Sequence, residues 1–125
     1  MDDALAKKID RFLALKLKMP SSELPRWTLA QAYEEAQRFS DARDEYAALV
    51  ELKPDYCLAW LRLGALYLGP LNDHEAARRA LIEGKRLAVE QGHNAPRIEA
   101  DSLLRELDGD SGVGAGGDDD EDWPS

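Results

Sequence analysis

The stretch that decides the fold reads YCLAWLRLGALYLGPL, from Tyr56 to Leu71. It carries one charged residue, Arg62, in a chain of which 33% is charged. A membrane span, a buried strand or a helix with two apolar faces could each produce such a run. A spanning helix needs about 20 apolar residues, whereas this run is shorter, contains an arginine and closes on Gly69-Pro70. No signal-peptide pattern precedes it, so we expect a cytoplasmic protein without a membrane span.

The apolar residues of this stretch recur at helical spacing. Four of them, at i, i+3, i+4 and i+7, share one face: Trp60, Leu63, Gly64 and Tyr67. A second apolar face lies beside it and contains Leu58, Leu61, Ala65 and Leu68. Strict alternation of apolar and polar residues, which would indicate a strand, is missing. We expect Asp55 to be the N-cap of the helix and Gly69-Pro70 to end it. A helix that is apolar on two sides is normally covered by more than one neighbour.

The chain also repeats itself. A shift of 34 residues places LPRWTLAQAY (24–33) over LAWLRLGALY (58–67), and FLALKLKMP (12–20) over YAALVELKP (46–54). The coinciding pairs are Phe12 and Tyr46, Leu15 and Leu49, Pro20 and Pro54, Leu29 and Leu63, and Tyr33 and Tyr67. One offset that serves both segments indicates a repeated helix–turn–helix unit.

With these residues the chain resembles the tetratricopeptide-repeat proteins. That pattern has a large residue, Leu-Gly or Leu-Ala and then Tyr in the first helix, followed by Ala, an aromatic residue and a closing Pro in the second. The first repeat matches at Leu29, Ala30, Tyr33, Ala42, Tyr46 and Pro54, and the second at Trp60, Leu63, Gly64, Tyr67, Ala77 and Leu81. Arg26 departs from the pattern, since it stands at the first large position. The second repeat has one extra residue around 69–72 and lacks its closing Pro or has it displaced to Pro96.

Together, the resemblance and the periodicity predict an all-α fold, a short α-solenoid of helix–turn–helix repeats. We expect one tetratricopeptide-repeat domain over 1–107, with a half-repeat helix over 3–18, repeat one over 22–54, repeat two over 55–90 and a capping helix over 95–107. The expected helices of the two repeats cover 22–37, 40–53, 56–68 and 73–90. Ser22, Ser40 and an Asn72–Glu75 capping box should begin helices. The residues expected to face inward on the terminal helices are Leu5, Ile9, Phe12, Leu13, Leu17, Ile98, Leu103, Leu104 and Leu107.

Residues that could support catalysis or bind a metal are scarce. The two histidines, His74 and His93, have no partner at ligand spacing, and the single Cys57 excludes both a disulfide framework and a cysteine zinc site. The glycine-rich stretch 109–117 leads into no further helix, so it reads as a linker. We therefore expect no enzyme, no catalytic residue, no metal site and no cofactor.

The formal charge of −9 is concentrated near one end of the chain. Residues 108–125 hold seven acids and no base, which leaves 18 acids against 16 bases elsewhere. We therefore expect no nucleic-acid partner and a disordered acidic tail over 108–125. The tail could solubilise the protein, bind a basic partner or fold back onto the groove described next. The candidate tail motif is Asp118, Asp119, Asp120, Glu121, Asp122 and Trp123.

The resemblance implies a concave groove, lined by the first helix of each repeat, that holds a peptide or helix from a partner protein. The corresponding residues are Leu24, Trp27, Gln31, Glu34, Leu58, Leu61, Arg62, Ala65 and Leu68. Trp27 and Leu61 coincide under the shift, so we expect them to be neighbours. Arg62 is the one cation of the set, whereas family members that clamp a terminal carboxylate use lysine, asparagine and arginine. The ligand should therefore bury apolar side chains.

The predicted function is that of a protein–protein interaction adaptor or scaffold. Neighbouring helices, or a second copy in a homodimer, could instead cover the apolar face. A tail-mediated binder of a basic protein is the other alternative. The first helix could also lie on a membrane surface through Lys7, Lys8, Arg11, Lys16 and Lys18, but its match to a repeat helix favours packing, so no membrane partner is expected.

Overall fold

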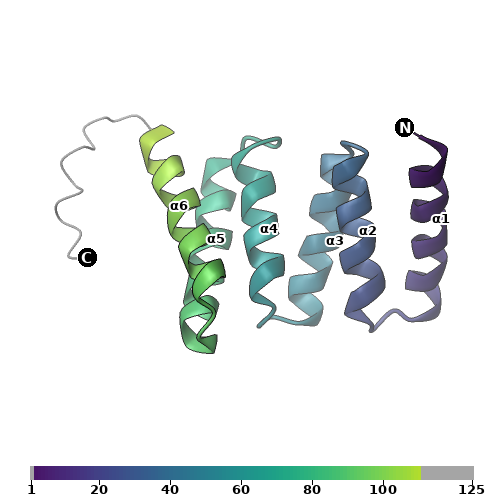
Figure 1. The fold of residues 1–125 in the computed structure, drawn as a ribbon, viewed down its shortest axis with the longest axis horizontal. Coiled ribbons are helices and arrows are strands. Elements are labelled where there is room, and N and C mark those ends of the chain that lie inside the picture. Colours follow the sequence, from purple (N-terminus) through teal and green to yellow (C-terminus); the bar gives the residue numbers. More distant parts are fainter. Residues whose placement is uncertain (1, 111–125) are drawn as a thin grey trace.

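The protein is all-helical over the residues that the structure, a computed structural model, describes, which are 2–110. The helices are α1 (Asp3–Lys18), α2 (Glu23–Glu35), α3 (Phe39–Leu52), α4 (Cys57–Leu68), α5 (His74–Gln91) and α6 (Asn94–Asp110) (Figure 1). The predicted fold class is therefore confirmed. One boundary is wrong, because residues 108–110, assigned to the tail, form the last turn of α6. The rest of the tail lies outside the described residues.

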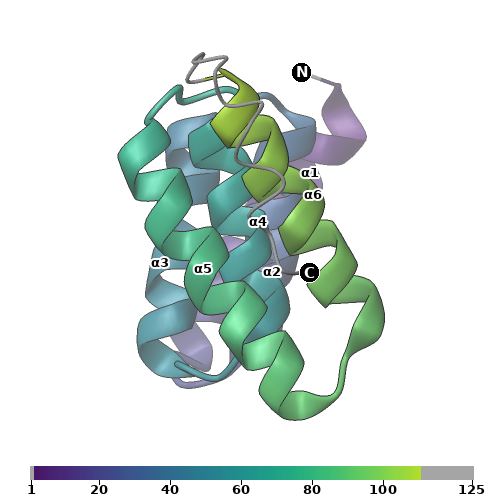
Figure 2. The same ribbon diagram turned by 90° about the vertical axis from the view of Figure 1, so that its left-hand side faces the viewer.

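The helices stack in a row with α1 and α6 at its two ends (Figure 1). Helices α2, α4 and α6 form one layer, and α3 and α5 form a second layer behind it (Figures 1 and 2). Within this stack α4 packs against α3, α5 and α6. The helix apolar on two faces thus has several neighbours, as its sequence predicts.

Glycine lets α4 and α5 approach each other closely. A Cβ atom on Gly64 of α4 would lie 2.6 Å from Cδ2 of Leu81, and one on Gly84 of α5 would lie 2.8 Å from Cδ2 of Leu61. Real Cβ atoms do not come so close to a neighbour, so each glycine makes room for the leucine opposite. Three alanines of the repeat pattern are likewise completely buried: Ala30, Ala42 and Ala77.

Large side chains fill the space between the helix pairs. Leu29, Tyr46 and Leu49 are completely buried in one hydrophobic cluster. A second cluster joins α4, α5 and α6 through residues that include Leu61, Leu81 and Ala100. Trp60 packs against both clusters, so apolar contacts continue along the row from one helix pair to the next.

Helix capping differs from the sequence expectation at several positions. Ser22 is the N-cap residue of α2, but its side chain accepts no capping hydrogen bond. Ser40 lies inside α3, and Tyr56 rather than Asp55 is the N-cap of α4. The capping box expected to begin at Asn72 is placed one residue too early. Asp73 caps α5, and its side chain accepts a hydrogen bond of 3.2 Å from the Ala76 amide. Asn72 instead turns the chain at φ 51°, a conformation that asparagine tolerates better than most residues.

Two residues expected to face inward point to solvent. Leu17 of α1 is 80% exposed and Ile98 of α6 is 53% exposed. Ile9, which is buried, and Leu17 are separated by roughly 80° around the helix axis, so Leu17 lies on a flank that no helix covers. Ile98 lies on the face of α6 opposite Ala100 and Leu107, which are buried.

Replacing Gly64 tests the close approach of α4 and α5. We expect Gly64→Ala to lower the free energy of unfolding by about 1–3 kcal/mol because the new methyl group overpacks against Leu81. Alanine's intrinsic helical advantage of about 1 kcal/mol works against this loss. Gly109→Ala is the matched control, since its Cβ would meet nothing within 4 Å. Urea unfolding followed by circular dichroism measures both, and a Gly64→Ala variant as stable as the control would contradict the packing described.

Candidate functional site

An exposed strip runs along α2 and α4. On α4 it consists of Leu58, Arg62 and Ala65, which follow one another at i, i+4 and i+7. Leu58 is 42% exposed, and Leu24 at the start of α2 is 64% exposed. Gln31 is exposed as well, while Trp27 and Glu34 are half-buried. Seven of the nine residues predicted to line the groove therefore reach the surface at least in part.

The other two predicted groove residues are buried. Leu61 is 2% exposed and Leu68 is 8% exposed. Leu61 shares a hydrophobic cluster with Ala100, and Leu68 shares one with Leu107. The prediction that these two residues line an open groove is therefore wrong. Helix α6 stacks against α4 in the position of the first helix of a further repeat and covers them. Neighbouring helices thus cover part of the second apolar face of α4.

The aromatic residues beside the strip form a cluster of their own. The Trp27 ring stacks on Tyr56 with a centroid distance of 5.4 Å and meets Tyr46 edge-on at 5.7 Å. Trp27 packs on the cluster of α1 to α4, whereas Leu61 belongs to the cluster with α6. The expected Trp27–Leu61 contact is therefore wrong. Trp27 is held by two tyrosines and forms a fixed wall between α2 and α4.

A partly buried hydrogen bond between α2 and α3 lies in the same region. The Tyr46 hydroxyl donates to Oε2 of Glu34 at 2.5 Å. Burial raises the pKa of Tyr46 strongly, and the hydrogen bond to Glu34 raises it further, while the nearby Arg62 lowers it. Glu34 is therefore engaged by the protein itself. Arg62, which is exposed, forms no ion pair within residues 2–110 and so remains available to a ligand.

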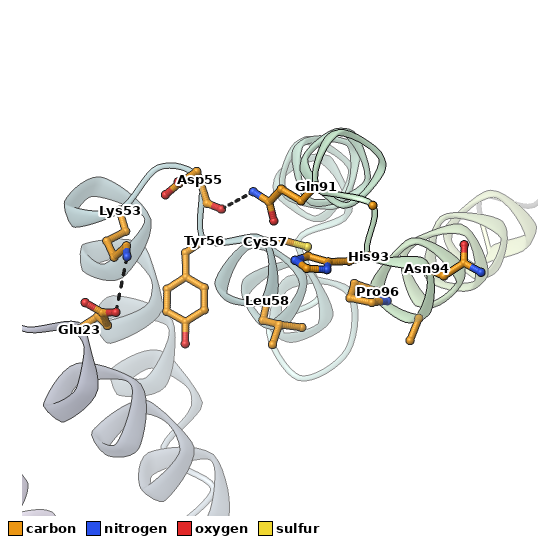
Figure 3. Close-up of a pocket in the computed structure, with 12 residues that line it drawn as sticks. Glu23, Lys53, Asp55, Tyr56, Cys57, Leu58, Gln91, His93, Asn94 and Pro96 are labelled. Atoms are coloured by element: carbon orange, nitrogen blue, oxygen red, sulfur yellow. Dashed lines mark hydrogen bonds and ion pairs between the residues drawn. The ribbon is translucent and has the colours of Figure 1, made fainter.

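An open cleft of about 820 Å³ continues the strip at the N-terminal ends of α4 and α6. Figure 3 shows Tyr56 and Leu58 pointing to the same side, with His93 and Pro96 beside them. A Glu23–Lys53 ion pair of 3.6 Å and a 2.8 Å hydrogen bond from Gln91 to the Asp55 carbonyl bound the cleft (Figure 3). Sequence reasoning missed these residues, apart from Leu58. They come from the ends of α2, α5 and α6 and from the turns before α4 and α6. The 34-residue pattern marks the faces of helices and not how their ends come together.

The thiol of Cys57 borders the cleft but is 4% exposed. Its Sγ donates to the Gly84 carbonyl at 3.6 Å, and burial raises the pKa of the thiol, with a further increase from Glu99. A thiol whose ionisation is disfavoured in this way is a weak nucleophile. Within residues 2–110, no three His, Cys, Asp or Glu side chains are placed to hold a metal ion, and no helix is long and apolar enough to cross a membrane.

Solved structures of tetratricopeptide-repeat domains are similar to this chain. The TPR2B domain of yeast Sti1, in a complex with pHsp70, has a TM-score of 0.75 at 15% identity, over 82% of this chain and 81% of that one. A tetratricopeptide-repeat domain protein from Salinibacter ruber has a TM-score of 0.66 at 28% identity, over 72% of this chain and 90% of that one. The first such domain of Spaghetti (RPAP3), bound to the HSP90 peptide SRMEEVD, has a TM-score of 0.69 at 24% identity, over 80% of this chain and 74% of that one.

No protein-family model and no curated protein matches the sequence. The structural similarity nevertheless covers 72–82% of the chain. The chain therefore has the tetratricopeptide-repeat fold, and the resemblance seen in its sequence is confirmed.

Two substitutions on α4 distinguish its buried face from its exposed strip. Leu61→Glu should lower the free energy of unfolding by more than about 3 kcal/mol, because it places an unpaired carboxylate in the core. Leu58→Glu should change stability by less than about 1 kcal/mol, because Leu58 reaches solvent. Thermal and urea unfolding of both variants measure the difference. Equal losses would contradict the division of α4 into a covered face and an exposed strip.

Proposed function

We propose that this protein is an interaction adaptor that binds an apolar peptide segment of a partner protein along the exposed strip of α2 and α4. The observation that carries the proposal is the pair of exposed aliphatic side chains, Leu24 and Leu58, on successive first helices of the repeats. Exposed apolar side chains beside a concave, preformed surface are typical of ligand sites. Trp27 and Tyr56 add a stacked aromatic wall next to them.

The solved relatives support a peptide ligand in general terms. The Sti1 domain is in a complex with pHsp70, and the Spaghetti domain is bound to an HSP90 peptide. Because these chains share the fold at 15% and 24% identity, they support the mode of binding and not the identity of the ligand.

The charges along the strip support an apolar ligand rather than a terminal carboxylate. Arg62 is the cation on the strip, and Lys53 at the cleft is already paired with Glu23 at 3.6 Å. A single arginine can orient one acidic or carbonyl group of a peptide, whereas the clamp that family members use for a terminal carboxylate needs several such groups. Leu24, Leu58 and the aromatic wall would bind apolar side chains of the peptide.

The role proposed is binding alone, without catalysis. Cys57, the one thiol, is buried with a raised pKa, and Glu34 is engaged by Tyr46. Within residues 2–110 the hydrogen-bond partners of these groups are the Gly84 carbonyl and the Tyr46 hydroxyl, and neither arrangement pairs a nucleophile with a base.

A homodimer through the apolar face is the alternative for the same surface. With Leu61 and Leu68 buried, the aliphatic area left on α4 is small, and obligate homodimers generally bury more than about 2,000 Å². Light scattering on Leu24→Glu and Leu58→Glu tests this alternative directly. A dimer that both substitutions dissociate would favour it over a peptide site.

Peptide selection on the full chain tests the proposed function. We expect a random-peptide phage library to yield ligands rich in apolar residues, whose affinity falls at least about tenfold in Leu58→Glu, a loss of about 1.4 kcal/mol. Ile82→Glu on α5 is the matched control, since Ile82 is 53% exposed and lies in the other layer. It should bind the selected peptides like the unmodified protein.

The outcome of this comparison is read by isothermal titration calorimetry with the same peptides. Equal losses in Leu58→Glu and Ile82→Glu would contradict a site on the α2–α4 strip. Selected peptides whose binding depends on a free terminal carboxylate would contradict the apolar character of the ligand.

A further inference from the structure

Helix α1 presents a basic stripe to solvent. Lys7, Arg11, Ala14 and Lys18 are exposed and follow one another at i, i+4, i+7 and i+11. This spacing places them on one face, directly opposite the buried Ile9. Lys8, also exposed, lies beside this face. The basic stripe, defined as Lys7, Arg11, Ala14 and Lys18, is thus the outer surface of the first helix of the stack.

The cations of the basic stripe have no acidic partner within residues 2–110. Among the basic residues of α1 only Lys16 forms an ion pair there, with Glu45 at 2.6 Å, and Arg11 lies over the ring of its neighbour Phe12 at 5.2 Å. Two acids of the helix, Asp3 and Asp10, flank the stripe without pairing with it. With five basic and two acidic side chains, α1 is the most positive of the six helices.

The complementary charge lies in a segment at the other end of the chain. Residues 118–122 read DDDED and are followed directly by Trp123, and there is no basic residue from 111 to 125. We propose that the basic stripe of one molecule binds Asp118–Trp123 of a second copy, so that the molecules associate head to tail.

The dimensions of the two segments agree. From Lys7 to Leu17 the helix rises about 15 Å, and an extended chain from Asp118 to Trp123 spans about 17 Å. The acids can therefore follow the cations while Trp123 reaches the end of the stripe. Apolar surface is present there, because Leu17 is 80% exposed and Met19 is 44% exposed. These two exposed side chains would contact the indole ring.

The reach of the chain favours a second copy over the same molecule. Helices α1 and α6 lie at opposite ends of the row (Figure 1), and packed helices are separated by about 8–10 Å. Three interaxial spacings separate α6 from α1, and the stripe lies on the outer face of α1, so the distance to span is roughly 29–36 Å. The eight residues from Asp110 to Asp118 extend to about 26–29 Å. The first acids of the segment thus fall short of the stripe on their own molecule.

Such an interface is heterologous, and it has a consequence that a closed dimer does not share. Each bound molecule leaves one free basic stripe at one end of the assembly and one free acidic segment at the other, so the assembly can grow. Exposed charge pairs contribute little individually and are screened by salt, so association is weak and depends on ionic strength.

Sedimentation equilibrium of the full chain tests the proposal. We expect the average mass to rise beyond that of a dimer as the concentration approaches about 1 mM in about 0.05 M salt. In about 0.5 M salt the association constant should fall at least about tenfold. Two variants should each be monomeric alone. The first is the double variant Lys7→Glu, Arg11→Glu. The second is the neutralised tail, which carries Asp118→Asn, Asp119→Asn, Asp120→Asn, Glu121→Gln and Asp122→Asn. Mixed together they should form a one-to-one complex that does not grow, because one supplies only the segment and the other only the stripe.

A matched charge control completes the design. The variant Arg43→Glu, Arg79→Glu changes the net charge by the same amount as Lys7→Glu, Arg11→Glu but leaves α1 unchanged. It should therefore still associate. A full chain that stays monomeric at low salt, or a neutralised tail that still associates, would overturn the proposal. Binding of the monomeric full chain to phosphatidylserine vesicles through the stripe, unchanged in the neutralised tail, would overturn it in favour of a membrane surface.

Discussion

The close approach of α4 and α5 is the constraint on which the rest of the structure depends. Gly64 and Gly84 each face a leucine of the other helix, with no room for a Cβ atom on either side. The resulting contact lets Leu61 and Leu81 share one cluster and leaves α4 near enough to α6 for Ala100 to join it. A wider spacing between α4 and α5 would expose this cluster to water. The exposure would destabilise the fold, because apolar side chains are stabilised by removal from water.

The same contact decides which part of α4 is left for a partner. Once α5 and α6 have covered Leu61 and Leu68, the helix keeps a narrow strip with Leu58, Arg62 and Ala65. The aromatic wall of Trp27 and Tyr56 and the Tyr46–Glu34 hydrogen bond fix the neighbouring helix positions. A strip held by rigid neighbours loses little conformational entropy when a ligand binds, which favours affinity.

Sequence reasoning succeeded where one periodic pattern controls the outcome. The 34-residue offset predicted the helices and the all-α stack, because a repeated helix pair can bury its apolar face only against its neighbours. Gly64 and Ala77 were correctly interpreted as close-packing positions. These inferences depend on local spacing, which a sequence contains in full.

The pattern failed where the ends of the stack matter. Leu61 is equivalent to the half-buried Trp27 under the 34-residue shift, yet it is buried. The cause is α6, which follows α4 in the row and covers Leu61. The shift treats the two repeats alike and so does not predict this difference. Leu17 and Ile98 have the spacing of inward residues but lie on terminal helices with one uncovered side. The cleft combines His93, in the turn before α6, with Pro96, in the first turn of α6. Helical periodicity carries no information about how turns and helix ends come together.

Native-state hydrogen exchange of the full chain, read residue by residue by NMR, tests the central role of the α4–α5 contact most directly. If the stack depends on this contact, the amides of α4 and α5 should exchange only through global unfolding, while those of α1 exchange through smaller, local openings. Protection of α1 equal to that of α4, or an opening of α4 and α5 that leaves α1 and α2 folded, would contradict this account.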